Sequence, residues 1–241
     1  MPKKYIPGET KAQRKARKNL AKQKKQPAPV PTNIVTNTPT ETSIAFVIGN
    51  GISRNSINLA MLRPFGKIYG CNALYRDFKP DYLIAVDTKM VLELNNKGVQ
   101  HEIETWTNPN RSYDHFTGFN FYQPSKGWSS GPTALWHASD STSYDTIYIL
   151  GFDFEGIGQQ VNNIYSGTQN YKAPDEKATY YGNWLKQTIV TIQNNPEKRY
   201  IRVLEKEDSF IPEPFNNFAN LSHITVEDFK KSFNISAYIE K

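Results

Sequence analysis

Small and polar residues follow the first apolar run of this chain, 44–48, and their types suit the binding of an anionic ligand. They are Gly49, Asn50, Gly51 and Ser53. Glycines let a backbone approach a ligand closely, and a helix behind them presents unpaired N–H groups to a phosphate. The same turn can simply connect a strand to a helix. Its spacing is neither GxGxxG nor a P-loop, because Arg54 stands at the third glycine and no Gly-Lys-Ser/Thr follows.

Polar residues also follow later apolar runs. Asn72 follows 67–71 and Asp87 follows 82–86. Asn72 can hydrogen-bond a base or ribose, or form a turn with its own backbone. Asp87 can bind a ribose hydroxyl or a metal, or cap the next helix. Because one carboxylate stands there without a DxD pattern, the sequence supports no metal site.

A second helix start lies at Ser130, Gly131 and Pro132. Ser130 suits an N-cap and Pro132 suits a first turn, which is the structural interpretation. The functional interpretation places a phosphate or carboxylate at this N-terminus, where the helix dipole favours negative charge. Two such N-termini at neighbouring strand ends would suit a nucleotide with a second anionic group.

The four histidines and the single cysteine give little chemistry by spacing alone. His137 lies in the same expected helix, and none of the histidines has metal-ligand spacing with another His or Cys. A structural role is therefore favoured for each. Cys71 lies in an expected strand and reads as a small buried apolar residue. The aromatic residues between 106 and 128 suit either a binding face for sugars or bases, or the core.

The elements that must position these residues follow from apolar patterning. Short apolar strands alternate with helices, which predicts an α/β fold, a Rossmann-like mostly parallel sheet with helices on both faces. Ligands bind such sheets outside the carboxyl ends of the strands, where the polar residues above are found. The expected strands are 44–48, 67–71, 82–86, 119–122, 146–150 and 200–204, and the expected helices are 56–62, 89–95, 131–139, 175–193 and 226–231.

The charge of the chain, +6 overall, is concentrated at one end. Residues 1–43 hold ten Lys/Arg against two Glu, a balance of +8, whereas the remaining 198 residues have a balance of −2. We therefore expect a basic N-terminal arm (1–25), a Pro/Thr-rich linker (26–42) and a near-neutral Rossmann-like domain (43–241). A near-neutral body argues against a DNA-binding domain. The arm suits an acidic partner, either a protein surface or nucleic acid, or it is a solubilising extension.

The sequence disfavours a membrane-spanning protein and a secreted one. No apolar run approaches the roughly 20 residues that span a bilayer, so we expect no membrane span. The first residues contain no apolar segment typical of a secretory signal. A single cysteine cannot form an internal disulfide, which fits a reducing compartment.

Taken together, the motifs resemble those of bacterial sialyltransferases that cap lipooligosaccharides, the Campylobacter-type group. In that family a first strand ends in Gly-Asn-Gly-Pro-Ser, a second in Cys-Asn, a Ser-Gly opens a helix, and a later strand ends in Gly-Ile-Asp-Phe. The matching residues, in the same order and at similar spacing, are Gly49-Asn50-Gly51-Ile52-Ser53, Cys71-Asn72, Ser130-Gly131 and Gly151-Phe152-Asp153-Phe154. The resemblance covers residues 44–155, under half of the chain.

The resemblance implies inverting, metal-independent transfer of a sugar from a CMP-activated donor, with no further cofactor. The nucleotide and donor sugar would be held by Asn50, Ser53, Asn72, Ser130 and Gly131, and the phosphate by Tyr165 and Tyr171 of the loop after Asp153. The family's general base is a histidine beyond that loop, and this sequence has none between 138 and 222. Either another group, such as Asp153 or His137, takes the role, or the chemistry differs or is lost.

A second resemblance concerns the first 25 residues, where MPKKYIP precedes a Lys/Arg/Gln-rich stretch. This opening is similar to those of small proteins from tailed phages of marine bacteria. The alternative to an enzyme is then a virion or assembly protein that keeps the fold without catalysis and docks through its basic arm. The corresponding locations are the cytoplasm of a host bacterium or the virion.

Overall fold

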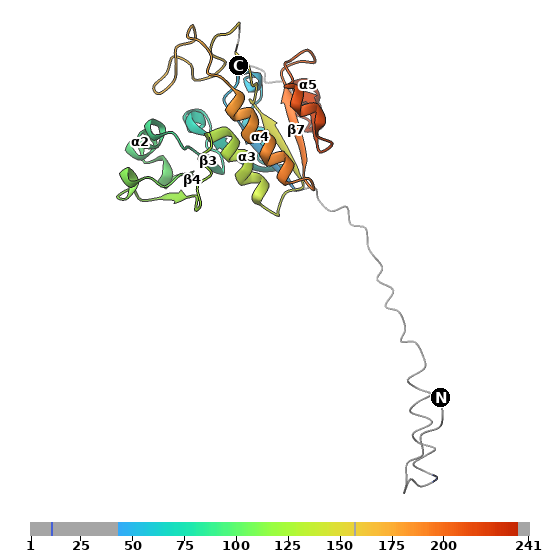
Figure 1. The fold of residues 1–241 in the computed structure, drawn as a ribbon, viewed down its shortest axis with the longest axis horizontal. Coiled ribbons are helices and arrows are strands. Elements are labelled where there is room, and N and C mark those ends of the chain that lie inside the picture. The colour runs from blue at the N-terminus through green and yellow to red at the C-terminus, as the bar shows by residue number, and fades with distance from the viewer. Residues whose placement is uncertain (1–10, 12–42, 157, 236–241) are drawn as a thin grey trace. The chain divides into compact units, whose positions relative to one another are not determined.

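The computed structural model describes residues 11, 43–156 and 158–235 (Figure 1). The predicted arm and linker therefore lie, apart from Lys11, outside the described residues. The described part contains one sheet of eight strands in the order β5-β4-β3-β2-β1-β6-β7-β8, and every pair of neighbours is parallel. The strands are β1 (Ile44–Ile48), β2 (Gly66–Cys71), β3 (Tyr82–Ile84), β4 (Glu104–Thr107), β5 (Phe119–Phe121), β6 (Thr146–Leu150), β7 (Arg199–Leu204) and β8 (Leu221–Thr225).

The chain changes direction across the sheet at β1. From β1 it proceeds through β2 to β5 on one side, then returns to place β6 on the other side of β1. Ile44 is in register with Gly66 of β2 and with Thr146 of β6, so the three strands end at similar heights. The connections after β1 and β6 run toward opposite edges of the sheet, and such a reversal of strand order leaves a crevice at the carboxyl ends of the strands. The predicted α/β fold with a parallel sheet is confirmed.

Helices cover both faces of the sheet because alternate side chains of each strand point to opposite sides. Ala45 and Val47 of β1 pack in the cluster that contains residues of α3 (Ser130–Asp140) and α4 (Gly182–Asn194). On the opposite face, Phe46 and Ile48 pack against a cluster that includes α5 (Val226–Ser232). Helix α2 (Thr88–Lys97) contributes to a third cluster with Leu83 of β3. Within the described ranges, the helices are too short or too polar to cross a membrane.

Two predicted helices were wrong in extent. The segment 56–62 forms no α-helix but follows a 3₁₀ turn at Ile52–Arg54 and contains another at Leu59–Leu62. The Asn58 side chain accepts a hydrogen bond from the Ala60 N–H and so starts the second turn locally. The helix expected from residue 175 begins at Gly182, because the backbone of Glu176 and Ala178 is hydrogen-bonded to Val161 and Gln159 instead.

Two strands were not predicted. β4 carries the sequence ETWT and β8 carries LSHIT, and neither is a continuous apolar run. In β4 the threonines Thr105 and Thr107 are fully buried, so one face of the strand is closed by β-branched polar side chains. The sequence pattern therefore looked irregular although the strand is paired on both sides.

The core at the centre of the sheet should dominate stability. Phe46 is fully buried and its ring contacts those of Tyr148, Phe229 and Phe233. We expect Phe46→Ala to lower the free energy of unfolding by about 3–5 kcal/mol, because the cavity cannot collapse between packed rings. Urea unfolding monitored by circular dichroism measures this. The control is Tyr180→Ala, whose side chain is 78% exposed and should change stability little. Equal effects of the two substitutions would contradict the placement of this core.

Candidate functional site

A pocket of about 450 Å³ opens at the carboxyl ends of the central strands, where the connections after β1 and β6 lead toward opposite edges of the sheet. Seven of the residues proposed from the sequence to bind a ligand line it together with Asp153: Gly49, Asn50, Gly51, Asn72, Ser130, Gly131 and Tyr171. Ser53 does not line this pocket but donates hydrogen bonds to the lining residue Asp153, and Tyr165 accepts one from Arg54, which itself donates to the Gly49 carbonyl. His137, which was proposed from the sequence as a catalytic group, does not line the pocket either.

The turn after β1 and the turn after β6 are held against each other. The Gly49 N–H donates to the Leu150 carbonyl at 2.7 Å, and the Gly51 N–H donates to the Gly151 carbonyl at 2.9 Å. A Cβ on Gly49 would lie 2.4 Å from the Gly151 oxygen, and Gly151 itself has a φ of +69°. Glycine is required here by close backbone approach and by a left-handed conformation. The pocket floor is therefore fixed by backbone.

Asp153 is tied to the first turn. Its Oδ1 accepts from the Ser53 hydroxyl at 2.5 Å, and its Oδ2 accepts from the Ser53 N–H at 3.2 Å. Asn162 acts similarly, since its Oδ1 accepts from the Ile52 N–H at 2.9 Å. Both side chains therefore orient the β1 turn, and both oxygens of the Asp153 carboxylate are engaged before any ligand arrives.

Asn50 and Asn72 face the pocket with unused hydrogen-bonding capacity. The Asn50 Nδ2 donates to the Tyr171 hydroxyl at 3.2 Å, and the residue is only 8% exposed. The Oδ1 atoms of both asparagines are buried and have no partner among the described residues. An unsatisfied buried acceptor costs about 1–3 kcal/mol. A ligand that brings N–H or O–H donors to these two oxygens would recover that cost.

The N-terminus of α3 opens into the pocket without a side-chain cap. Ser130 was expected to cap the helix, but its hydroxyl accepts from the Val86 N–H at 3.1 Å and so fixes the loop after β3. The N-cap position is Ser129, whose side chain makes no capping bond to the described residues. The first N–H groups of an eleven-residue helix are thus directed at the pocket, next to Gly131.

Asp87 lies at the rim of the pocket, where its side chain is exposed to the crevice. It occupies the N-cap position of α2 but makes no capping hydrogen bond with the described residues. Partial burial raises the pKa of its carboxyl. The structure thus leaves this carboxylate available to a ligand rather than to the helix.

Arg54 is a buried arginine that holds the turn after β1, and it was not identified as functional from the sequence. The Arg54 Nε donates to the Gly49 carbonyl at 2.6 Å, and its Nη2 donates to the Tyr165 hydroxyl at 3.3 Å. Burial raises the pKa of both Tyr165 and Tyr171, so these phenols stay protonated near neutrality. The signal was present, since Arg54 replaces a glycine of the dinucleotide motif.

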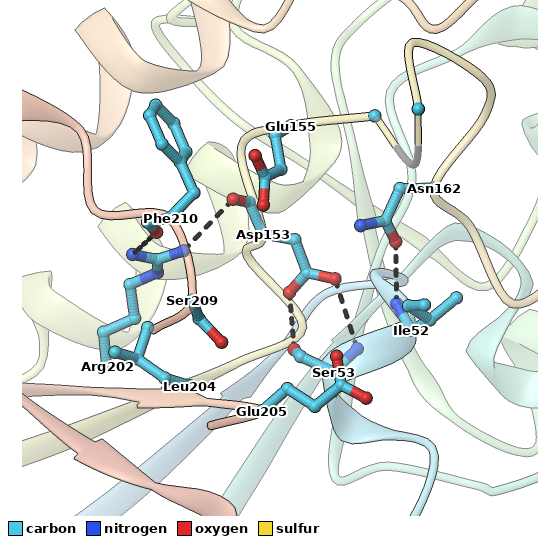
Figure 2. A pocket seen from close by; sticks show the side chains of 12 residues that line it. Ile52, Ser53, Asp153, Glu155, Asn162, Arg202, Leu204, Glu205, Ser209 and Phe210 are labelled. Carbon is cyan, nitrogen blue, oxygen red and sulfur yellow. Dashed lines mark hydrogen bonds between the residues drawn. The ribbon is translucent and has the colours of Figure 1, made fainter. Parts of the chain in front are cut away.

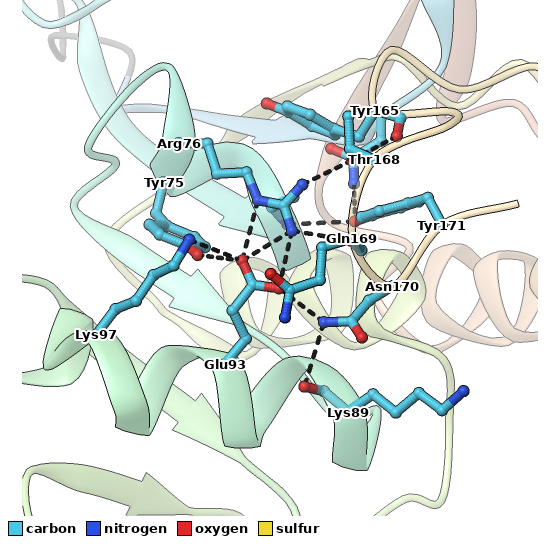
Figure 3. A network of polar contacts seen from close by, with 12 residues as sticks. Tyr75, Arg76, Lys89, Glu93, Lys97, Tyr165, Thr168, Gln169, Asn170 and Tyr171 are labelled. Atoms are coloured by element: carbon cyan, nitrogen blue, oxygen red, sulfur yellow. Dashed lines mark hydrogen bonds and ion pairs between the residues drawn. The ribbon is translucent and has the colours of Figure 1, made fainter. Parts of the chain in front are cut away.

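The loop that carries both tyrosines is anchored to α2 by an ionic network (Figure 3). Glu93 is buried and pairs with the Arg76 Nη2 at 2.7 Å, while the Tyr75 hydroxyl and the Asn170 amide also donate to its carboxylate. Arg76 in turn donates to the Thr168 hydroxyl at 2.7 Å. Burial alone would raise the pKa of Glu93, but the bonds from Tyr75, Arg76 and Lys97 outweigh it and lower that pKa.

His137 lies in the last turn of α3, among aromatic rings. Its Nδ1 is 3.0 Å from the Tyr122 hydroxyl, and its ring is 4.8 Å from that of Trp106. Burial lowers the pKa of its imidazole. The structure does not bring His137 together with Asp153, and a packing role accounts for its contacts.

A second pocket, of about 340 Å³, adjoins the first at the end of β7 (Figure 2). Arg202 forms its base and is 3% exposed. Its three nitrogens donate to backbone carbonyls of Phe152, Phe210 and Asp153 at 2.8–3.1 Å. Burial lowers the pKa of this guanidinium to about 10, although Asp153 and Glu155 oppose the shift.

Comparisons with known proteins add no relative. No family model matches this chain, and neither a curated protein nor a solved structure matches it. Among the described residues, no group of three or more His, Cys, Asp or Glu side chains is placed to hold a metal ion. Function is therefore inferred from the two pockets.

The Glu93 network should make the tyrosine loop acid-sensitive. Because the folded-state pKa of Glu93 is lowered, its stabilisation is present above the unfolded-state value of about 4.5 and is lost as the pH falls through the folded-state pKa. We expect Glu93→Gln to cost about 3 kcal/mol at pH 7, because Arg76 loses its partner, and less at pH 3. Urea unfolding at both pH values measures this. Glu102→Gln, in an exposed pair with Lys79, is the control and should have little effect. A cost that does not depend on pH would contradict the role of the Glu93 charge.

Proposed function

We propose that the protein binds a nucleotide sugar in the pocket at the carboxyl ends of β1, β2 and β6 and transfers the sugar from a CMP-type donor without a metal ion. The observation that carries this proposal is a pair of buried, unpartnered amide oxygens, on Asn50 and Asn72, beside an uncapped helix N-terminus. A nucleotide combines hydroxyl and amino donors with an anionic phosphate, and so complements both features.

The size and place of the pocket support a small-molecule ligand. Its volume of about 450 Å³ falls within the roughly 300–1,000 Å³ of small-molecule sites. It lies at the point where the strand order reverses, which is the usual ligand position in open parallel sheets. The phosphate would lie at the start of α3, near Gly131, and the nucleoside near Asn50 and Asn72.

The two loop tyrosines would then have different roles. Tyr171 lines the pocket, and its oxygen accepts hydrogen bonds from Asn50 and from the Ala73 N–H, which leaves its own hydroxyl proton for a phosphate. Tyr165 contacts Arg54 beneath the turn instead. We therefore keep Tyr171 as the phosphate contact and assign Tyr165 to holding Arg54 in place.

The chemistry would be inverting sugar transfer to an acceptor hydroxyl. His137 is too remote from the pocket lining to serve as its base. Asp153 is near, but its carboxylate is engaged by Ser53. In this proposal Asp153 shapes the donor pocket rather than moving a proton.

Nucleotide binding tests the proposal. We expect CMP to bind the protein in isothermal titration calorimetry, and Asn50→Ala or Asn72→Gly to weaken binding about tenfold each, as loss of one hydrogen bond predicts. Glycine at position 72 preserves the left-handed backbone, since Asn72 has a φ of +52°. Asn234→Gly is the matched control, because Asn234 is also left-handed (φ +49°) but lies outside the pocket lining. The proposal fails if neither CMP, UMP nor GMP binds the wild-type protein.

The charge of residues 1–43 supports a second candidate, a virion or assembly protein that docks through its arm on an acidic surface. Deletion of residues 1–42 separates the candidates. An enzyme should retain nucleotide binding and turnover, because the described strands all lie beyond residue 42. A docking protein should lose co-sedimentation with phage particles, and particles still bound by the truncated protein would exclude docking through the arm.

If the arm binds nucleic acid, its affinity should fall steeply with added salt.

A further inference from the structure

The second pocket has lining residues in common with the proposed donor pocket. Three residues line both cavities: Asp153, Glu155 and Asn162. All three lie in the segment between β6 and α4. A group in one cavity can therefore reach a ligand atom in the other across these residues.

Only one of the three shared side chains is uncommitted. Asp153 accepts two bonds from Ser53, and the Asn162 Oδ1 accepts one from Ile52. The Glu155 carboxylate makes no hydrogen bond or ion pair with the described residues, and its side chain is exposed at the boundary. Figure 2 shows it beside Asp153. Glu155 therefore supplies the one shared carboxylate that can engage a ligand.

Arg202 does not neutralise the second pocket by direct pairing. Its guanidinium uses three of its five N–H donors on backbone carbonyls around the cavity. The remaining polar lining includes the carboxylates of Asp153, Glu155 and Glu205 and the hydroxyl of Ser209. Hydrogen-bond acceptors dominate, which suits a ligand rich in hydroxyl donors and disfavours an anion.

We infer that the second pocket binds a neutral polyhydroxyl acceptor, a sugar, and that Glu155 is the general base that activates its hydroxyl. The inference rests on the proposed function of the first pocket. The acceptor oxygen attacks the anomeric carbon of the donor sugar, and the bond from that carbon to the phosphate oxygen breaks. The bonding electrons leave on the phosphate of CMP. The hydroxyl proton passes to the Glu155 carboxylate and then to solvent.

The electrostatic setting of Glu155 agrees with this role. Burial, followed by the charge of Asp153, raises the pKa of its carboxyl, while Arg202 opposes the shift. A carboxylate of raised pKa remains ionised near neutrality but accepts a proton more readily than an ordinary one. The phenyl ring of Phe210 adds an apolar surface on which a sugar ring can pack.

Removal of the carboxylate separates catalysis from donor binding. With CMP-N-acetylneuraminate as donor and neutral methyl glycosides of galactose, glucose and N-acetylglucosamine as acceptors, Glu155→Gln should lower kcat at least 100-fold. The variant should still bind CMP, because the residues proposed to contact CMP are Asn50, Asn72 and Tyr171 rather than Glu155. The control is Glu207→Gln. Glu207 is exposed, lies between Glu205 and Ser209 in the sequence and lines neither pocket, so this variant should retain wild-type transfer.

A second variant fills the acceptor site. Ser209→Trp should abolish transfer to the glycosides and retain CMP binding, because Ser209 lines only the second pocket. Wild-type transfer that survives both substitutions would overturn this inference and leave the donor site standing. Transfer to none of the neutral glycosides would overturn the acceptor class. Absence of CMP binding in the wild-type protein would overturn the donor site, and the acceptor site with it.

Discussion

The close approach of the turns after β1 and β6 is the constraint on which the rest of the site depends. A Cβ on Gly49 would lie 2.4 Å from the Gly151 oxygen, and one on Gly51 would lie 2.4 Å from the Asp153 carboxylate. Because no side chain fits between the turns, their backbones pair directly beyond the ends of the strands. This pairing lets Asp153 reach Ser53 across 100 residues of sequence. The crevice on either side of the paired turns is then left for ligands.

Two buried arginines stabilise these turns in a way that leaves carboxylates available. Arg54 and Arg202 are 6% and 3% exposed, and both donate to backbone carbonyls of the turns. A guanidinium buried without hydrogen bonds would be very costly, so the carbonyls that satisfy it are held firmly in place. Neither arginine pairs with Asp87 or Glu155, and these two carboxylates have no hydrogen-bond partner among the described residues. The backbone around the pockets is thus held by hydrogen bonds, and both carboxylates can engage a ligand.

The sequence predicted the parallel sheet and most residues of the first pocket, because apolar runs mark buried strands and polar residues mark their ends. Confirmed elements include β1 and β6 at their full lengths. It could not predict β4, whose buried threonines break the apolar pattern, nor the pairing of Glu93 with the tyrosine loop. Such contacts join segments that are distant in sequence. His137 shows the converse, since its residue type suggested chemistry but its place in α3 is set by aromatic packing.

The segment between β6 and α4 is held to the β1 turn by backbone and side-chain hydrogen bonds together. The Gly51 N–H donates to the Gly151 carbonyl and the Ile164 N–H donates to the Asn50 carbonyl, while the Asn50 side chain donates to the Tyr171 hydroxyl. The segment also reaches the core, because Tyr165 is buried in the cluster that contains Leu83. A phosphate that accepted a hydrogen bond from Tyr171 would add a contact to this segment. Donor binding and the contact between this segment and the β1 turn would then stabilise each other, because both use the Tyr171 hydroxyl.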